Sequence, residues 1–148
     1  MPDVLVDAGA LIALLDRDDA EHERCVEALK GIRDPLVTVW PALTEAMHLL
    51  ADTPRVPAAL CDLVSDAAVR LFDLKAPDFR RMKDLMQKYR DLPMDFADAA
   101  LVCAAEREQL TRIVTVDRDF EVYRLPRRAR FTVLPGRRSS HPGRRSRT

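Results

Sequence analysis

No apolar run in this sequence approaches the roughly 20 residues that a membrane-spanning helix needs. The N-terminus also lacks the basic start and long apolar stretch of a signal peptide. Cysteine is scarce, and the three residues Cys25, Cys61 and Cys103 lie far apart with no C-x-x-C spacing for a metal or redox site. We therefore expect reduced thiols in the core of a cytoplasmic protein.

The charge is balanced over the whole chain but not along it. Residues 1–126 carry all 24 acids and 16 of the 24 bases, a net charge of −8, whereas residues 127–148 carry eight bases and no acid. Residues 136–148 offer no apolar side chain that could anchor them to a core. We predict a folded domain over residues 1–135 and a disordered basic tail over residues 136–148. The tail is either a solubilising extension or an arm that binds phosphates.

Apolar runs alternate with helical patterns along the domain. The apolar runs predict strands at about 3–7, 35–40, 69–74, 112–116 and 130–134. Helical spacing of apolar residues predicts helices over 18–32, 76–90 and 96–109, and Pro41, Pro57 and Pro77 suit the first turns of helices. This alternation, in a chain long enough for one core, predicts a single α/β domain.

The most informative pattern is an acid at the point where an apolar strand ends. Asp7 follows Val4-Leu5-Val6, Asp117 follows Ile113-Val114-Thr115-Val116, and Glu45 comes soon after the second strand. In an open parallel sheet the carboxyl ends of the strands face one crevice. Two carboxylates about 4 Å apart repel by about 4 kcal/mol at an effective dielectric constant of 20. A hard divalent cation such as magnesium or manganese would stabilise such a cluster.

Each aspartate also has a purely structural explanation. Asp7 could cap a following helix, and Asp95 could cap the helix in which Asp98 occupies the first turn. Asp117 could belong to a turn, and for Asp119 a turn or cap is the preferred interpretation.

Glu45 is harder to explain structurally. It lies on an otherwise apolar helix face, and the only basic residue within four positions is His48. A carboxylate buried there would need a partner. We interpret His22 and His48 as packing histidines and Trp40 as a core residue at the end of a strand.

Taken together, the acids and their flanking residues resemble the PIN-domain ribonucleases, especially the VapC-type toxins of prokaryotic toxin–antitoxin pairs. The matching stretches occur in the order found in that family and span residues 4–124: Val4-Leu5-Val6-Asp7 with Ala10 to Asp16, His22, Pro41 to Glu45, Leu92 to Ala99, and Ile113 to Phe120.

The resemblance implies a three-layer α/β fold in which a short parallel sheet is flanked by helices. By position, Asp7, Glu45, Asp98 and Asp117 match the four acids of the family, and Asp95 matches an extra acid of uncertain role. The implied chemistry is hydrolysis of RNA with Mg²⁺ or Mn²⁺, in which Asp7, Asp98 and Asp117 serve the metal and Glu45 holds or deprotonates the attacking water. One departure is that Ala8 and Gly9 supply no hydroxyl group after the first aspartate.

The resemblance further implies three partners: RNA, a cognate antitoxin and a second copy of the chain. A haloacid-dehalogenase-like phosphatase fits poorly, because it needs a second aspartate where this chain has Gly9. A response-regulator receiver fits poorly as well, because residues 111–120 contain no lysine. A PIN-like scaffold that binds RNA or protein without catalysis stays open as the alternative.

Overall fold

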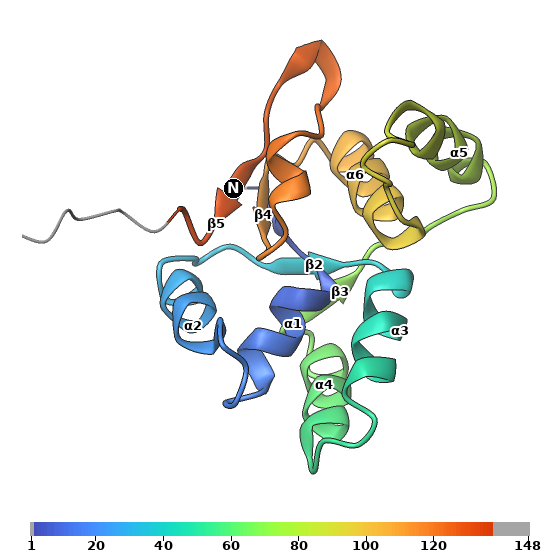
Figure 1. Cartoon of the computed structure of the whole chain (residues 1–148). Coiled ribbons are helices and arrows are strands. Elements are labelled where there is room, and N and C mark those ends of the chain that lie inside the picture. Colours follow the sequence, from blue (N-terminus) through green and yellow to red (C-terminus); the bar gives the residue numbers. More distant parts are fainter. Residues whose placement is uncertain (1, 138–148) are drawn as a thin grey trace, which may run out of the picture.

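The computed structural model of the chain describes residues 2–137 and contains one parallel sheet (Figure 1). Its five strands are hydrogen-bonded in the order β3–β2–β1–β4–β5, and every pair is parallel. The strands are β1 (Val4–Val6), β2 (Leu36–Thr38), β3 (Val69–Leu71), β4 (Arg112–Val114) and β5 (Thr132–Leu134). All five lie within the predicted strand ranges, so the predicted strands are confirmed.

Six α-helices cover the sheet on both faces, with α1 to α4 on one side and α5 and α6 on the other (Figure 1). Two short 3-10 helices precede β5. The bounds are α1 (Ala8–Leu15), α2 (His22–Lys30), α3 (Trp40–Leu49), α4 (Val56–Ser65), α5 (Asp78–Lys88), α6 (Phe96–Glu108), η1 (Arg118–Glu121) and η2 (Pro126–Arg128). The predicted three-layer α/β fold with a short parallel sheet is confirmed. Within the described residues, no helix is both long and apolar enough to cross a membrane.

The strand order reverses at β1, and this reversal positions the site. From β1 the chain runs outward through β2 to β3 with its helices on one face, and then returns to β4 with α5 and α6 on the other face. Right-handed crossover connections place the helices on opposite faces when the direction reverses. The loops after β1 and β4 therefore diverge and leave a crevice at the carboxyl ends of these strands.

The core forms around β1 and α6. All three residues of β1 are buried, and α6 is buried from Ala97 to Ala105, where five alanines let the helix approach the sheet closely. Buried Thr38, at the end of β2, donates a hydrogen bond from Oγ1 to the carbonyl oxygen of Val6 at 2.6 Å. The carboxyl ends of β1 and β2 are thus held together beside the crevice.

Several side chains lie at the surface rather than in the predicted core. Trp40 is 58% exposed, because β2 ends at Thr38 and α3 begins at Trp40 with Pro41 in its first turn. Cys61 is exposed on α4, whereas Cys25 and Cys103 are buried as predicted. His48 is exposed on α3, so its interpretation as a packing residue is wrong. His22 is half-buried, and its Nδ1 lies 2.6 Å from the carbonyl oxygen of Ala13.

The predicted basic tail falls mainly outside the described residues. Its first two residues, Gly136 and Arg137, are described and contact the domain. The guanidinium of Arg24 donates to the carbonyl oxygen of Gly136 at 2.6 Å, and Arg137 forms an ion pair with Glu121 at 2.5 Å. The chain after β5 therefore passes along η1, next to the crevice. Residues 138–148 lie outside the described part of the chain.

Candidate metal centre

The predicted acids converge on one hollow of about 190 Å³ at the carboxyl ends of β1 and β4. Among the residues that line this acidic hollow are all five predicted site residues: Asp7, Glu45, Asp95, Asp98 and Asp117. None of its described lining residues is Lys, Arg or His, so the acids have no basic neighbour in the hollow. The acids come from four separate parts of the chain, and the fold brings all of them together.

Asp7 is held rigidly at the start of α1. Its Oδ1 accepts a hydrogen bond from the backbone N–H of Ala10 at 2.9 Å, and its Oδ2 accepts one from the Thr115 hydroxyl. The N-cap explanation for Asp7 is therefore correct, and it is compatible with a place in the acidic hollow. Burial raises the pKa of Asp7 to about 6, with smaller contributions from the charges of Asp117 and Glu45.

Thr115 connects the two strand ends. Its hydroxyl donates to Asp7 and accepts from the backbone N–H of Asp117 at 2.9 Å. Asp117 in turn accepts from the N–H of Asp119 at 2.9 Å and caps η1. A single buried hydroxyl thus fixes both acids that follow the central strands. Sequence analysis assigned Thr115 only to the strand, because nothing in the local sequence indicates a partner 108 residues away.

Asp98 enters the hollow from the first turn of α6. Asp95 caps this helix by accepting the N–H of Asp98 at 2.8 Å, as its N-cap explanation predicts. The second oxygen of Asp98, Oδ2, accepts a hydrogen bond from the hydroxyl of Tyr123 at 2.8 Å. Burial raises the pKa of Asp98 to about 7, and the charges of Asp95, Asp117 and Asp7 add to the rise although the Tyr123 bond opposes it.

Glu45 lies at the margin of the hollow, on α3, and its side chain is exposed. It therefore needs no buried partner. Partial burial raises the pKa of Glu45, and the charges of Asp95 and Asp117 contribute to the rise. A carboxyl group with a raised pKa at the mouth of the hollow is suited to accept a proton from water.

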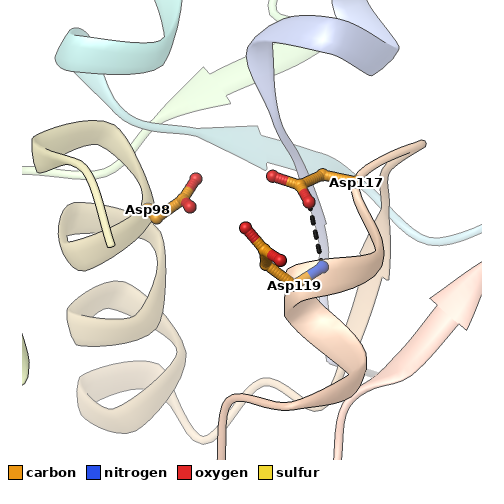
Figure 2. Close-up of side chains that lie close together, drawn as sticks. All are labelled: Asp98, Asp117 and Asp119. Atoms are coloured by element: carbon orange, nitrogen blue, oxygen red, sulfur yellow. Dashed lines mark hydrogen bonds between the residues drawn. The ribbon is translucent and has the colours of Figure 1, made fainter. Parts of the chain in front are cut away.

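Asp119 lies beside the predicted acids, although the sequence indicated only a turn or cap for it. One carboxylate oxygen each from Asp98, Asp117 and Asp119 lie within 4.8 Å of one another (Figure 2). Figure 2 shows Asp98 extending from α6 toward the other two, of which Asp117 precedes η1 and Asp119 lies on it. The position of Asp119, two residues after Asp117, was the signal in the sequence that could have revealed it, because a turn can direct both carboxylates to one side. Burial and the Asp117 charge raise the pKa of Asp119.

This donor set fits a hard divalent cation. Three carboxylate oxygens converge, and burial together with the charges of neighbouring acids raises the pKa values of Asp98 and Asp119. Oxygen ligands without sulfur or imidazole favour magnesium, manganese or calcium over softer metals. The residues present therefore fit the metal that the fold implies.

The chain thus combines a five-stranded parallel sheet with an acidic crevice at the reversal of strand order. A model of the PIN domain matches residues 4–125, so the chain belongs to the PIN-domain family. Within that family it is 30% identical over 135 residues to ribonuclease VapC26 of Mycobacterium tuberculosis, covering 89% of this chain and all of the relative. The VapC-type resemblance predicted from sequence is confirmed.

Solved structures of this type share the fold. The VapC20 toxin of M. tuberculosis, described as cleaving the sarcin–ricin loop, matches with a TM-score of 0.75 and 18% identity, over 81% of this chain and 94% of that one. A toxin–antitoxin complex from Klebsiella pneumoniae matches with a TM-score of 0.63 and 16% identity, over 78% and 88%. VapBC2 of Rickettsia felis, bound to a promoter DNA fragment, matches with a TM-score of 0.60 and 12% identity, over 88% and 97%.

Proposed function

We propose that this chain is a Mg²⁺- or Mn²⁺-dependent endoribonuclease that acts in the cytoplasm as the toxin of a type II toxin–antitoxin pair. The observation that carries the proposal is the convergence of the Asp98, Asp117 and Asp119 oxygens within 4.8 Å, in a crevice without basic side chains among its described lining. The 30% identity to a named VapC ribonuclease supports the same activity.

The proposed roles follow from position and burial. Asp98 and Asp117 would hold the cation, together with Asp119, and buried Asp7 would complete the negative site from the carboxyl end of β1, next to that of β4. A bound divalent ion supplies charge neutralisation for a phosphate group and lowers the pKa of a bound water. Glu45 orients or deprotonates the attacking water from the mouth of the hollow. Asp95 acts first as the cap that orients Asp98, and its own carboxylate lies within reach of the hollow.

An antitoxin is the proposed regulatory partner. The described lining of the acidic hollow holds acids and no basic side chain, so in the absence of metal it repels RNA phosphates. An arginine from a partner protein would neutralise the acids through charge-assisted hydrogen bonds and exclude both metal and substrate. Co-expression with a neighbouring small gene should relieve growth arrest caused by this chain. A purified pair that does not bind would contradict the proposal.

A homodimer is the proposed assembly, and one surface suits it. An aromatic groove of about 750 Å³ lies beside the acidic hollow, and its lining includes Trp40, Leu74, Phe79 and Phe96. Trp40, Phe79 and Phe96 come from three different helices, and each is more than 40% exposed. The exposed aromatic side chains and the groove lie on the same face. Two copies could therefore pack about a twofold axis, because in such an interface both copies use the same surface patch. Burial of this patch would bring two acidic hollows close together.

The experiment that tests the activity is RNA cleavage by the purified protein. Mg²⁺ or Mn²⁺ should support cleavage, and excess EDTA should abolish it. Asp98→Asn and Asp117→Asn should lose cleavage, whereas Asp62→Asn, an exposed aspartate on α4, should keep it. Cleavage that persists in EDTA would refute metal dependence. RNA binding without cleavage or metal binding would favour the non-catalytic scaffold.

A further inference from the structure

Tyr123 is a fully buried side chain whose hydroxyl contacts the acidic site. It lies two residues beyond η1 with no solvent exposure, and it donates to Oδ2 of Asp98 at 2.8 Å. The expected metal chemistry does not require a phenol at this position. The hydrogen bond is therefore a feature of this chain that the proposed function leaves unexplained.

The position of the Tyr123 hydroxyl is fixed by packing. Its ring makes edge contacts with Phe120, at a centroid distance of 5.1 Å, and with Tyr89, at 5.0 Å. Burial and the hydrogen bond to Asp98 raise the pKa of Tyr123 above its ordinary value. The packing around the ring therefore holds the phenol in place as a donor to Asp98.

Because of this donor, the two oxygens of Asp98 have different surroundings. Oδ2 is occupied by the phenol, and Oδ1 accepts no hydrogen bond from any described residue. A carboxylate held in this way is oriented to offer one oxygen to a cation. Mg²⁺ takes six ligands in a strict octahedron, commonly with single oxygens from carboxylates, whereas Ca²⁺ takes six to eight ligands and readily accepts both oxygens of one carboxylate.

We propose that Tyr123 is a positioning residue that restricts Asp98 to a single metal-facing oxygen and thereby favours Mg²⁺ and Mn²⁺ over Ca²⁺. The inference rests on the metal site of the proposed function and adds a selectivity determinant to it. Tyr123 touches neither substrate nor the reacting atoms in this scheme. It acts through Asp98, because a hydrogen bond to a metal ligand orients that ligand and commonly changes the metal affinity.

Two single-hydroxyl deletions give a matched test. Tyr123→Phe removes the donor to Asp98, whereas Tyr89→Phe keeps the ring that packs against Tyr123 and removes only the hydroxyl that accepts the backbone N–H of Arg124 at 2.9 Å. Calorimetry should measure the affinities of wild type and both variants for Mg²⁺, Mn²⁺ and Ca²⁺ in the absence of RNA. Removal of such a hydrogen bond typically changes metal affinity by about 10- to 100-fold. We expect the ratio of Ca²⁺ to Mg²⁺ affinity to rise by about tenfold in Tyr123→Phe and to stay unchanged in Tyr89→Phe.

The two possible failures are distinguishable. A wild-type protein that binds none of these cations would refute the proposed function and this inference with it. A folded Tyr123→Phe variant whose ratio of Ca²⁺ to Mg²⁺ affinity equals that of the wild type would overturn only the role of Tyr123.

A second measurement does not depend on the folding of Tyr123→Phe. The chain contains only two tyrosines, so protein labelled with ¹³C at the tyrosine ζ position gives two signals, which Tyr89→Phe assigns. Diamagnetic Mg²⁺ should shift the Tyr123 signal and leave that of Tyr89 in place. Saturation with Mg²⁺ that moves neither signal would also overturn the inference.

Discussion

Asp7→Asn should stabilise the metal-free protein at neutral pH, although it removes a residue proposed to be essential for activity. Burial raises the pKa of Asp7 from 3.8 to about 6 in the folded protein. At 1.36 kcal/mol per pKa unit, the ionised carboxylate costs about 3 kcal/mol of folding free energy relative to its protonated form. The protonated form of Asp7 therefore contributes to the free energy of unfolding. Because the folded-state pKa is raised, this contribution is fully present below pH 3.8 and is lost as the pH rises through about 6.

The asparagine removes this penalty but also weakens one contact. Its side-chain oxygen can still accept the N–H of Ala10, whereas the buried Thr115 hydroxyl faces the amide group and loses its acceptor, which costs about 2 kcal/mol. The difference is a gain of about 1 kcal/mol, which corresponds to a rise of about 2–4 °C in Tm for a chain of this size. At pH 4 most of the wild-type Asp7 is protonated, so the gain should disappear or reverse.

Thermal unfolding at pH 7.5 and pH 4, with EDTA present, measures both effects. Asp78→Asn is the matched control, because Asp78 is equally buried but already has a counter-charge in Arg107 at 2.8 Å. This control should lower Tm at pH 7.5, since it removes the negative charge that faces Arg107. A fall in Tm of the Asp7→Asn variant as large as that of the control would refute the reasoning. Asp7 would then serve mainly as a helix cap and hydrogen-bond acceptor.

Three further predictions concern the surroundings of the acidic hollow. Glu45→Gln should reduce the rate of RNA cleavage far more than the affinity for Mn²⁺, measured by calorimetry, because Glu45 lies at the mouth of the hollow rather than among the three converging oxygens. Deletion of residues 138–148 removes four arginines and should flatten the salt dependence of RNA affinity, by up to about 0.7 in log–log slope for each lost phosphate contact; an unchanged slope would make the tail a solvated extension. Phe79→Arg should convert a dimer to a monomer in light scattering, whereas Val122→Arg, an equally exposed apolar position outside the aromatic groove, should not; equal behaviour of the two variants would place the interface elsewhere.

The residues that sequence analysis identified are those with a local signature. Asp7 and Asp117 each follow an apolar run, and Asp98 begins an apolar helix, so their place at a sheet edge follows from rules of parallel sheets. The same local patterns located all five strands. Trp40 was misplaced because an apolar residue at the end of a strand is indistinguishable in sequence from one that begins a helix.

The residues that sequence analysis missed acquire their roles only through tertiary contacts. Thr115 matters because β1 and β4 are adjacent, which places its hydroxyl against Asp7. Tyr123 matters because η1 turns its ring toward α6, where Asp98 lies. Asp119 was assigned to a turn, which is correct for its backbone but does not reveal that its carboxylate joins those of Asp98 and Asp117. No periodicity of apolar residues encodes such contacts.

The pairing of β1 with β4 also determines when during synthesis the proposed toxin can become active. β1, β2 and β3 leave the ribosome early and can pair with one another, but the second edge of β1 stays open until residues 112–114 have been made. Until then Asp7 lacks the Thr115 hydroxyl, and the acids on the turn after β4 do not yet exist. A nascent chain therefore carries no assembled cation site beside the RNA-rich ribosome that produces it. If the acids act as proposed, we expect activity to begin only when the late strand completes the sheet.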